Sequence, residues 1–154
     1  MTIRILGILT IAVLAACSPA PGTERVSAGG SFDIASAGTQ LSVQRGQGGI
    51  IRPLSHSPAL QAAAQSHADD LSRMNALTHQ GSDGAALNDR LRRAGYSACA
   101  AVENVANDTG DIRATIAQWM ASPDHRANIL NPQVTQFGFA DSGTYWVLVM
   151  ARPC

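Results

Sequence analysis

The segment Tyr145–Met150, near the end of the 154-residue chain, restricts the possible folds more than any other part of the sequence. It reads Tyr-Trp-Val-Leu-Val-Met and is apolar on both alternations, whereas a strand with one solvated face alternates apolar and polar residues. Such a strand needs cover on two faces, which indicates a sheet between two layers of helices. We expect it to span 144–151 and to form a hairpin with 134–140 through a turn at 141–143.

Helix signals recur upstream of this hairpin. The clearest helix has Ser57 as its N-cap and Pro58 at its first position. Its apolar face comprises Leu60, Ala64, His67, Leu71 and Met74. Because His67 lies on this face, we interpret it as a core histidine hydrogen-bonded to the backbone, with ligand binding as the alternative. A weaker helix is expected between 34 and 47, closed by the glycine pair at 48–49.

A loop rich in turn-forming residues, at 77–84, follows the clear helix. It contains His79, and loops of this kind often present functional side chains. A short helix is expected at 87–94, followed by a strand at 96–106. That strand contains Glu103, whose carboxylate is a second candidate functional group beside the imidazole of His79.

The stretch around Ser122 combines a helix end, a proline turn and a histidine. Because Pro123 disfavours the α conformation in the residue before it, the helix that carries Trp119 is expected to stop at Ser122. Trp119 itself is expected in the core. Asp124 is then expected to cap the next helix and to leave His125 at its first helical position.

The first 32 residues are predicted to precede the folded domain. Residues 1–16 have a charged tip at Arg4 and an apolar run that is too short to cross a bilayer, which is typical of a secretory signal. Residues 17–32 are rich in proline and glycine and have no apolar periodicity, which predicts a flexible tether. Residues 33–154 fit one domain with one core.

The signal ends in Leu14-Ala-Ala-Cys17, which resembles the lipobox of bacterial lipoproteins, in which the cysteine becomes the acylated first residue. The resemblance implies a membrane anchor at Cys17 and, with Ser18 after it, sorting to the outer membrane. An ordinary signal peptide cut nearby is the alternative. Acylation leaves Cys99 and Cys154, which we expect to form a disulfide in an oxidising compartment, the alternative being a free C-terminal thiol that acts as a nucleophile.

The charged residues exclude some functions. The 11 basic and 11 acidic residues give a formal net charge of zero, so we expect no nucleic-acid partner. All 11 basic residues are arginines. Without lysine, the sequence excludes Schiff-base chemistry and a serine/lysine dyad.

Several separated stretches carry a family resemblance. They are His79, Glu103-Asn104-Val105-Ala106, Trp119-x-x-Ser-Pro-x-His-Arg-x-Asn-Ile-Leu130, Phe137-Gly138-Phe139 and the closing Tyr145-Trp146. In this order and spacing, over about 38–152, the chain resembles the bacterial branch of the CAP superfamily, also called SCP-like extracellular proteins. The resemblance implies an α/β (α+β) fold, a three-layer α/β/α sandwich with an antiparallel central sheet.

The resemblance also implies a site. The family cavity is lined by two histidines and two acidic residues, which correspond here to His79, Glu103 and His125, with Ser122 in place of the second acid. Two imidazoles beside a carboxylate suit Zn²⁺ or another divalent ion, so we expect His79, His125 and Glu103 to bind a metal weakly. Ser122, His125 and Glu103 equally suit a hydrolase. In a third interpretation, Glu103 accepts hydrogen bonds from its neighbours and only fixes the cavity.

These features predict a lipid-anchored protein of the cell envelope, held at the outer membrane or otherwise secreted or periplasmic. We expect a binding or interaction module rather than an enzyme, with an unknown envelope protein, lipid or polymer as its ligand. An envelope hydrolase or peptidase is one alternative. Lipid or sterol binding, implied only by other branches of the family, is another.

Overall fold

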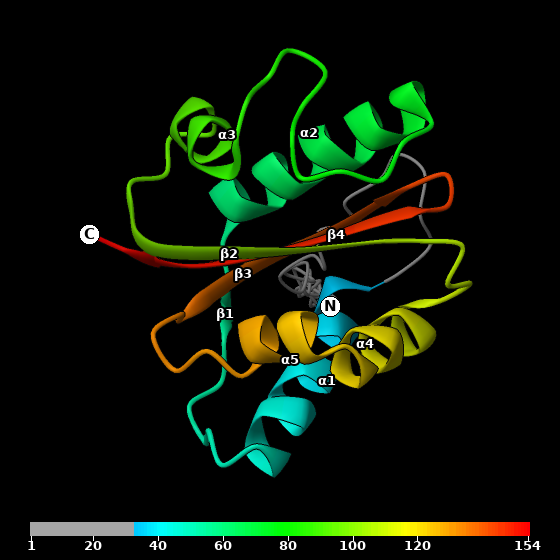
Figure 1. Cartoon of the computed structure of the whole chain (residues 1–154). Coiled ribbons are helices and arrows are strands. Elements are labelled where there is room, and N and C mark those ends of the chain that lie inside the picture. The colour runs from blue at the N-terminus through cyan, green and yellow to red at the C-terminus, as the bar shows by residue number, and fades with distance from the viewer. Residues whose placement is uncertain (1–32) are drawn as a thin grey trace, which may run out of the picture.

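The computed structural model describes residues 33–154, in which a four-stranded sheet lies between two layers of helices (Figure 1). The strands lie in the order β1-β3-β4-β2 and comprise β1 (Ser55–His56), β2 (Ala98–Asn107), β3 (Gln136–Ser142) and β4 (Tyr145–Pro153). The signal peptide predicted at 1–16, the acylation predicted at Cys17 and the tether predicted at 17–32 lie outside the described residues.

The helices divide between the two faces of the sheet. One layer contains α2 (Pro58–Met74) and α3 (Leu87–Arg93), and the other contains α1 (Ile34–Gln47), α4 (Ile112–Ala121) and α5 (Pro123–Ile129), as Figure 1 shows. The predicted three-layer sandwich is therefore confirmed. None of these helices has the length and apolar character needed to span a membrane.

Strand β4 is the centre of the core. It pairs antiparallel with β3 on one side and with β2 on the other, and it is buried from Tyr145 to Ala151. Its side chains alternate between two apolar clusters, with Trp146, Leu148 and Met150 on the α1/α4/α5 side and Tyr145, Val147, Val149 and Ala151 on the α2/α3 side. The prediction of a strand with two covered faces is confirmed.

The sheet contains one strand that the sequence did not predict. β1 is two residues long and pairs in parallel with β3, where Ser55 faces Gln136 and His56 faces Phe137. A strand of two residues is too short to show an alternation of apolar and polar residues, so no sequence pattern could predict it. The other two pairings are antiparallel, as expected.

Helix α2 begins where the sequence predicted and packs directly on β3. Ser57 caps it by accepting a hydrogen bond from Leu60 N at 3.4 Å. The side chain of Gln61 continues the hydrogen bonds that β1 makes with the backbone of β3. Its Nε2 donates to Phe139 O at 2.8 Å, and its Oε1 accepts from Phe139 N at 3.0 Å. The approach is close at Gly138, where a Cβ would lie 2.2 Å from the carbonyl carbon of Leu60.

Arg45 joins α1 to the segment that follows α5. Its side chain is buried, and Nη1 donates to Ile129 O at 2.7 Å and Asn131 O at 2.9 Å, while Nη2 donates to Val134 O at 3.4 Å. Burial lowers the pKa of this guanidinium. One side chain therefore supplies partners to three backbone carbonyls, which fixes the return of the chain toward β3.

The prediction for the start of α5 is wrong. Ser122 has extended backbone (φ -95°, ψ 124°) and is the N-cap, while Pro123 occupies the first helical position. Proline is well tolerated there because its missing N–H would have no partner in the first turn. Asp124 is therefore inside the helix, and His125 is its third residue rather than its first.

The C-terminal hairpin forms one or two residues later than expected. β3 continues to Ser142, which still faces Tyr145, so the connection is reduced to 143–144. Gly143 has φ 61°, a left-handed conformation that glycine adopts without strain. The predicted disulfide between Cys99 and Cys154 is present and joins the start of β2 to the end of the chain, beside β4.

Replacing Gly138 by alanine is expected to lower the free energy of unfolding by about 2 to 3 kcal/mol, because the added methyl group overlaps the backbone of α2 and the two elements must separate. Urea denaturation followed by tryptophan fluorescence measures the change. Gly46→Ala is the matched control: it lies in α1 with no atom within 4 Å of the new Cβ, and should stabilise by about 0.5 to 1 kcal/mol. Equal stability of Gly138→Ala and the wild type would contradict the close contact.

Candidate functional site

The candidate site lies at the edge of the sheet, where Glu103 and Asn104 stand next to each other on β2. β2 is an edge strand, and successive side chains of a strand point to opposite faces. Glu103 accordingly contacts residues of the α2/α3 side, and Asn104 contacts α5. The two neighbours on β2 thus connect the two helical layers at one edge of the sheet.

The carboxylate of Glu103 is buried and surrounded by basic side chains. Its Oε1 accepts from His79 Nδ1 at 2.9 Å, and its Oε2 accepts from Arg90 Nη2 at 2.6 Å. His67 Nε2 lies 3.8 Å from Oε1. Each oxygen therefore has a charge-assisted partner, and these partners offset the cost of burying the charge.

Arg90 is a site residue that the sequence analysis missed. Its side chain is 6% exposed and pairs with Glu103. It also holds the loop before α3, because Nη1 donates to His79 O and Ala85 O, both at 3.0 Å. No local pattern distinguishes Arg90 from the other arginines of α3, since its acid partner lies 13 residues further along the chain.

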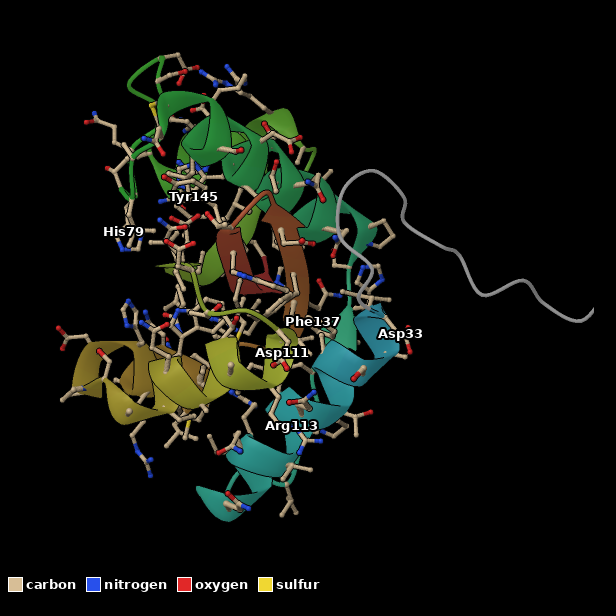
Figure 2. All side chains as sticks on the ribbon, turned by 90° about the vertical axis from the view of Figure 1, so that its right-hand side faces the viewer. Asp33, His79, Asp111, Arg113, Phe137 and Tyr145 are labelled. Carbon is tan, nitrogen blue, oxygen red and sulfur yellow. A yellow bond between two sulfur atoms is a disulfide. The ribbon has the colours of Figure 1, made fainter. Side chains whose placement is uncertain are left out.

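His79 is presented to solvent by the loop that was predicted to carry it. Its side chain is 60% exposed and points toward the α4/α5 layer (Figure 2). The hydrogen bond with Glu103 raises the pKa of His79, and burial and Arg90 oppose that shift. Because Nδ1 is held by Glu103, Nε2 is the ring nitrogen that remains for a ligand.

His67 behaves as the predicted core histidine. It is fully buried on α2, and its Nε2 lies 3.0 Å from Thr78 O, beside His79 in the chain. Burial lowers the pKa of His67, although the charge of Glu103 opposes the shift. The ring therefore helps to fix the loop that carries His79.

His125 reaches the same region from α5, on the other side of the sheet. Burial is the main cause that lowers the pKa of His125, and the charge of His79 lowers it further, so the two imidazoles act on each other. The backbone of His125 is held to β2, because Asn104 Nδ2 donates to His125 O at 3.0 Å. Asn128 supports this bond by donating to Asn104 Oδ1 at 2.8 Å and to Glu103 O at 3.2 Å.

The two asparagines are also site residues that were not assigned a role from sequence. Asn104 and Asn128 both lie within the stretches that carry the family resemblance, which is the signal that could have identified them. Their function is to position α5 against β2, and the contacts that reveal it span more than 20 residues.

Ser122 is held in place through its backbone. Its backbone ends α4, with N donating to Trp119 O at 3.2 Å, and begins α5, with O accepting from Arg126 N at 2.8 Å. Within 33–154, no hydrogen bond joins its hydroxyl to His125 or Glu103. Nor does this part of the chain hold a group of three His, Cys, Asp or Glu side chains arranged to bind a metal ion.

We expect His79 to titrate with a pKa above its ordinary value of 6.5 and His125 with a pKa below it. Folding raises the pKa of His79, so its contribution to stability is fully present below pH 6.5 and is lost as the pH rises through the folded-state pKa. Glu103→Gln should lower the pKa of His79 because the carboxylate charge is removed. Imidazole chemical shifts followed by NMR from pH 5 to 9 measure both values.

Asp124→Asn is the matched control for this titration, because Asp124 raises the pKa of His125 and does not contribute to that of His79. It should lower the pKa of His125 and leave His79 unchanged. A pKa of His79 that is the same in Glu103→Gln and in the wild type would contradict the pairing.

Known proteins share this architecture. The model of the CAP, or cysteine-rich secretory protein, family matches residues 45–149. YkwD of Bacillus subtilis is 31% identical over 98 residues, which cover 62% of this chain and 38% of that protein. A Bacillus anthracis extracellular protein containing an SCP domain has a TM-score of 0.73 at 24% identity, over 77% of this chain and 39% of the other. An outer surface protein of Borrelia burgdorferi has a TM-score of 0.71 at 17% identity, over 79% of this chain and 92% of the other.

This chain spans well under half the length of the two Bacillus relatives. The two solved structures are less than 25% identical to it, so their likeness shows a shared fold and nothing more. The family match extends from Arg45 in α1 to Val149 in β4 and includes His79, Glu103, Ser122 and His125. The chain belongs to the CAP family.

Proposed function

We propose that this protein is a binding module of the bacterial cell envelope, which presents His79 and His125 to its ligand, and that it is not a hydrolase. The observation that supports this choice is the state of Glu103, whose two oxygens are occupied by His79 and Arg90. A carboxylate held in this way orients the ring of His79, while Ser122, the nucleophile of the alternative, lies outside this pairing. The ligand class remains the one expected from sequence, an envelope protein, lipid or polymer.

The hydrolase alternative requires a different arrangement. Ser122 would need its hydroxyl within hydrogen-bond reach of a histidine that Glu103 orients. Glu103 instead orients His79, which comes from the opposite helical layer to Ser122. The pairing of acid and histidine is present, but Ser122 takes no part in it.

We propose that His79 and His125 alone bind Zn²⁺ or another divalent ion weakly, since residues 33–154 hold no group of three His, Cys, Asp or Glu side chains arranged around an ion. His79 would offer Nε2, with Glu103 behind Nδ1 in the arrangement that commonly orients metal-binding histidines. His125 would offer a second imidazole, kept neutral near pH 7 by its lowered pKa. A bound ion would supply a positively charged centre with open positions for a ligand oxygen. Two imidazoles are fewer than the four ligands of structural zinc sites, so the affinity would be modest.

The envelope location rests on the N-terminal sequence and on the relatives. Residues 1–16 and Cys17 have the pattern of a lipoprotein signal, and the structural neighbours include an extracellular protein and an outer surface protein. An acylated Cys17 followed by a tether at 17–32 would hold the domain close to a membrane while leaving it free to contact partners.

Calorimetric titration with Zn²⁺ tests the proposed site. The wild type should give a saturable heat that is largely lost in His79→Ala and in His125→Ala, and Glu103→Gln should weaken binding by about tenfold to a hundredfold. Protons compete for the imidazoles, so binding should weaken as the pH falls through the raised pKa of His79.

His56→Ala is the control, because His56 lies on β1, away from β2 at the opposite edge of the sheet. It should bind Zn²⁺ as the wild type does. Equal heats from the wild type and both site variants would mean that the histidines do not bind metal and that Glu103 is only a structural partner.

Replacing Cys17 by serine is expected to abolish fatty-acid labelling and to release the protein from the membrane fraction, because no thioether can form at the first mature residue. Metabolic labelling with a clickable fatty acid, followed by fractionation, measures both effects. Cys99→Ser removes a different cysteine and should leave the labelling intact. Absence of label from the wild-type chain in its native host would refute the anchor.

A further inference from the structure

Strand β2 has an outer edge, because it pairs with β4 on one side only. In an antiparallel pair, every second residue directs its backbone N–H and C=O toward the partner strand, and the residue between directs them away. Just beyond β2, Asp108 N donates to Thr144 O, which sets the alternation. The backbone groups of Ala101, Glu103 and Val105 therefore point away from β4.

Side chains of the α4/α5 layer close only part of this edge. Trp119 Nε1 donates to Val105 O at 3.1 Å, and Asn128 Nδ2 donates to Glu103 O at 3.2 Å. Within 33–154, no hydrogen bond engages the N–H or C=O of Ala101 or the N–H of Glu103. Glu103 is 6% exposed, and a backbone donor with little access to water is costly to leave without an acceptor. Two donors and one acceptor thus remain at 101–103.

The open part of the edge also lacks the usual protection against another strand. Natural edge strands carry charged residues, proline or bulges that prevent pairing with a second chain. Residues 98–102 read Ala-Cys-Ala-Ala-Val, are at least partly exposed, and contain neither charge nor proline. The irregular pairing with β4, between Ala98 and Ala100, lies before the free groups. Small side chains therefore leave the backbone of this stretch open to a close partner.

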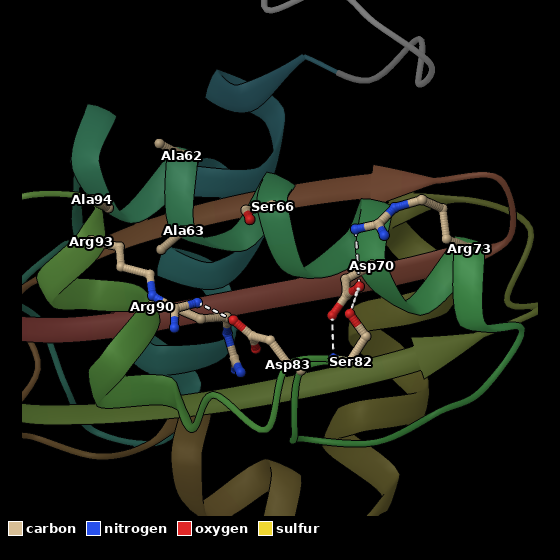
Figure 3. A pocket seen from close by; sticks show the side chains of 11 residues that line it. Ala62, Ala63, Ser66, Asp70, Arg73, Ser82, Asp83, Arg90, Arg93 and Ala94 are labelled. Atoms are coloured by element: carbon tan, nitrogen blue, oxygen red, sulfur yellow. Dashed lines mark hydrogen bonds and ion pairs between the residues drawn. The ribbon is translucent and has the colours of Figure 1, made fainter.

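The loop at 79–85 forms the wall beside this edge on the α2/α3 side, and it is held firmly from behind (Figure 3). Asp70 of α2 accepts from the backbone N and the hydroxyl of Ser82, both at 2.7 Å. Arg90 Nη1 donates to His79 O at 3.0 Å. The imidazole of His79 is therefore held in a fixed position on this side of β2.

The wall on the other side is α5. Asn104 Nδ2 donates to His125 O at 3.0 Å, which fixes this helix against β2. A strand that paired with the free groups at 101–103 would lie between the two helical layers (Figure 1). Because successive side chains of a strand point to opposite faces, one of its residues would face the His79 side and the next the His125 side.

We propose that the ligand of this site is an extended polypeptide segment, which pairs with β2 at 101–103 as a fifth strand of the sheet. The backbone of an extended peptide offers acceptors and donors at the spacing of the free groups, whereas a lipid or a glycan has no such row. The inference rests on the binding function proposed above and names the chemical class of its ligand. The two histidines would then contact side chains of the bound segment.

A capped heptapeptide of alternating threonine and valine, residues that favour strands, is the probe. Titrated into the full-length protein without metal, it should shift the backbone amide signals of Ala101 and Glu103 in a saturable way. The same peptide with every backbone amide methylated cannot donate hydrogen bonds and should not bind. Absence of saturable shifts at these two amides, or equal binding of the methylated peptide, would overturn the proposal.

Ala101→Pro removes one of the free donors, and proline is tolerated in an edge strand where the N–H points outward. It should weaken binding of the heptapeptide by about fivefold or more, the effect of one backbone hydrogen bond. Ile51→Pro is the matched control, because Ile51 is 94% exposed in the loop before β1, at the opposite edge of the sheet. It should bind the peptide as the wild type does. The amide spectrum of each variant, recorded without peptide, verifies that it is folded.

Calorimetry with Zn²⁺ separates this inference from the proposed metal site. Ala101→Pro should bind Zn²⁺ as the wild type does, because no side chain of the metal site is changed. Equal peptide affinity of Ala101→Pro and the wild type would refute strand pairing and leave the metal site standing. A mass that doubles with protein concentration, together with amide shifts at Ala101 without peptide, would assign the edge to a second copy of this chain and also overturn the proposal.

Discussion

The burial of β4 on both faces is the constraint on which the rest of the structure depends. A strand with apolar side chains on both alternations cannot lie at a surface, so helices must cover the sheet on each side. The central position of β4 leaves β2 at one edge, opposite β1. The polar residues of β2 can therefore reach both helical layers, and the candidate site forms at the open edge of the sheet.

Glu103 is the second organising residue, because a buried carboxylate must be paired. Its partners come from α3 and from the loop before that helix, so one charge fixes the loop, the helix and the strand together. Arg90 completes this arrangement by donating to the backbone of His79. On the other face, Asn104 holds the backbone of His125. The two histidines thus owe their positions to adjacent residues of one strand.

The proposed binding role rests on the place of Ser122. A serine hydrolase needs a nucleophile within reach of the histidine that its carboxylate orients. Glu103 is instead locked between Arg90 and His79, and Ser122 serves as the junction between α4 and α5.

The sequence by itself determined the layered fold, the start of α2 and the disulfide between Cys99 and Cys154, because these depend on local alternation, on capping residues and on a count of cysteines. Resemblance indicated Glu103 and the two site histidines. Only the tertiary structure decided the roles of Arg90 and Asn104. The physical reason is that a hydrogen bond between polar groups 13 or more residues apart has no period and leaves no pattern along the chain.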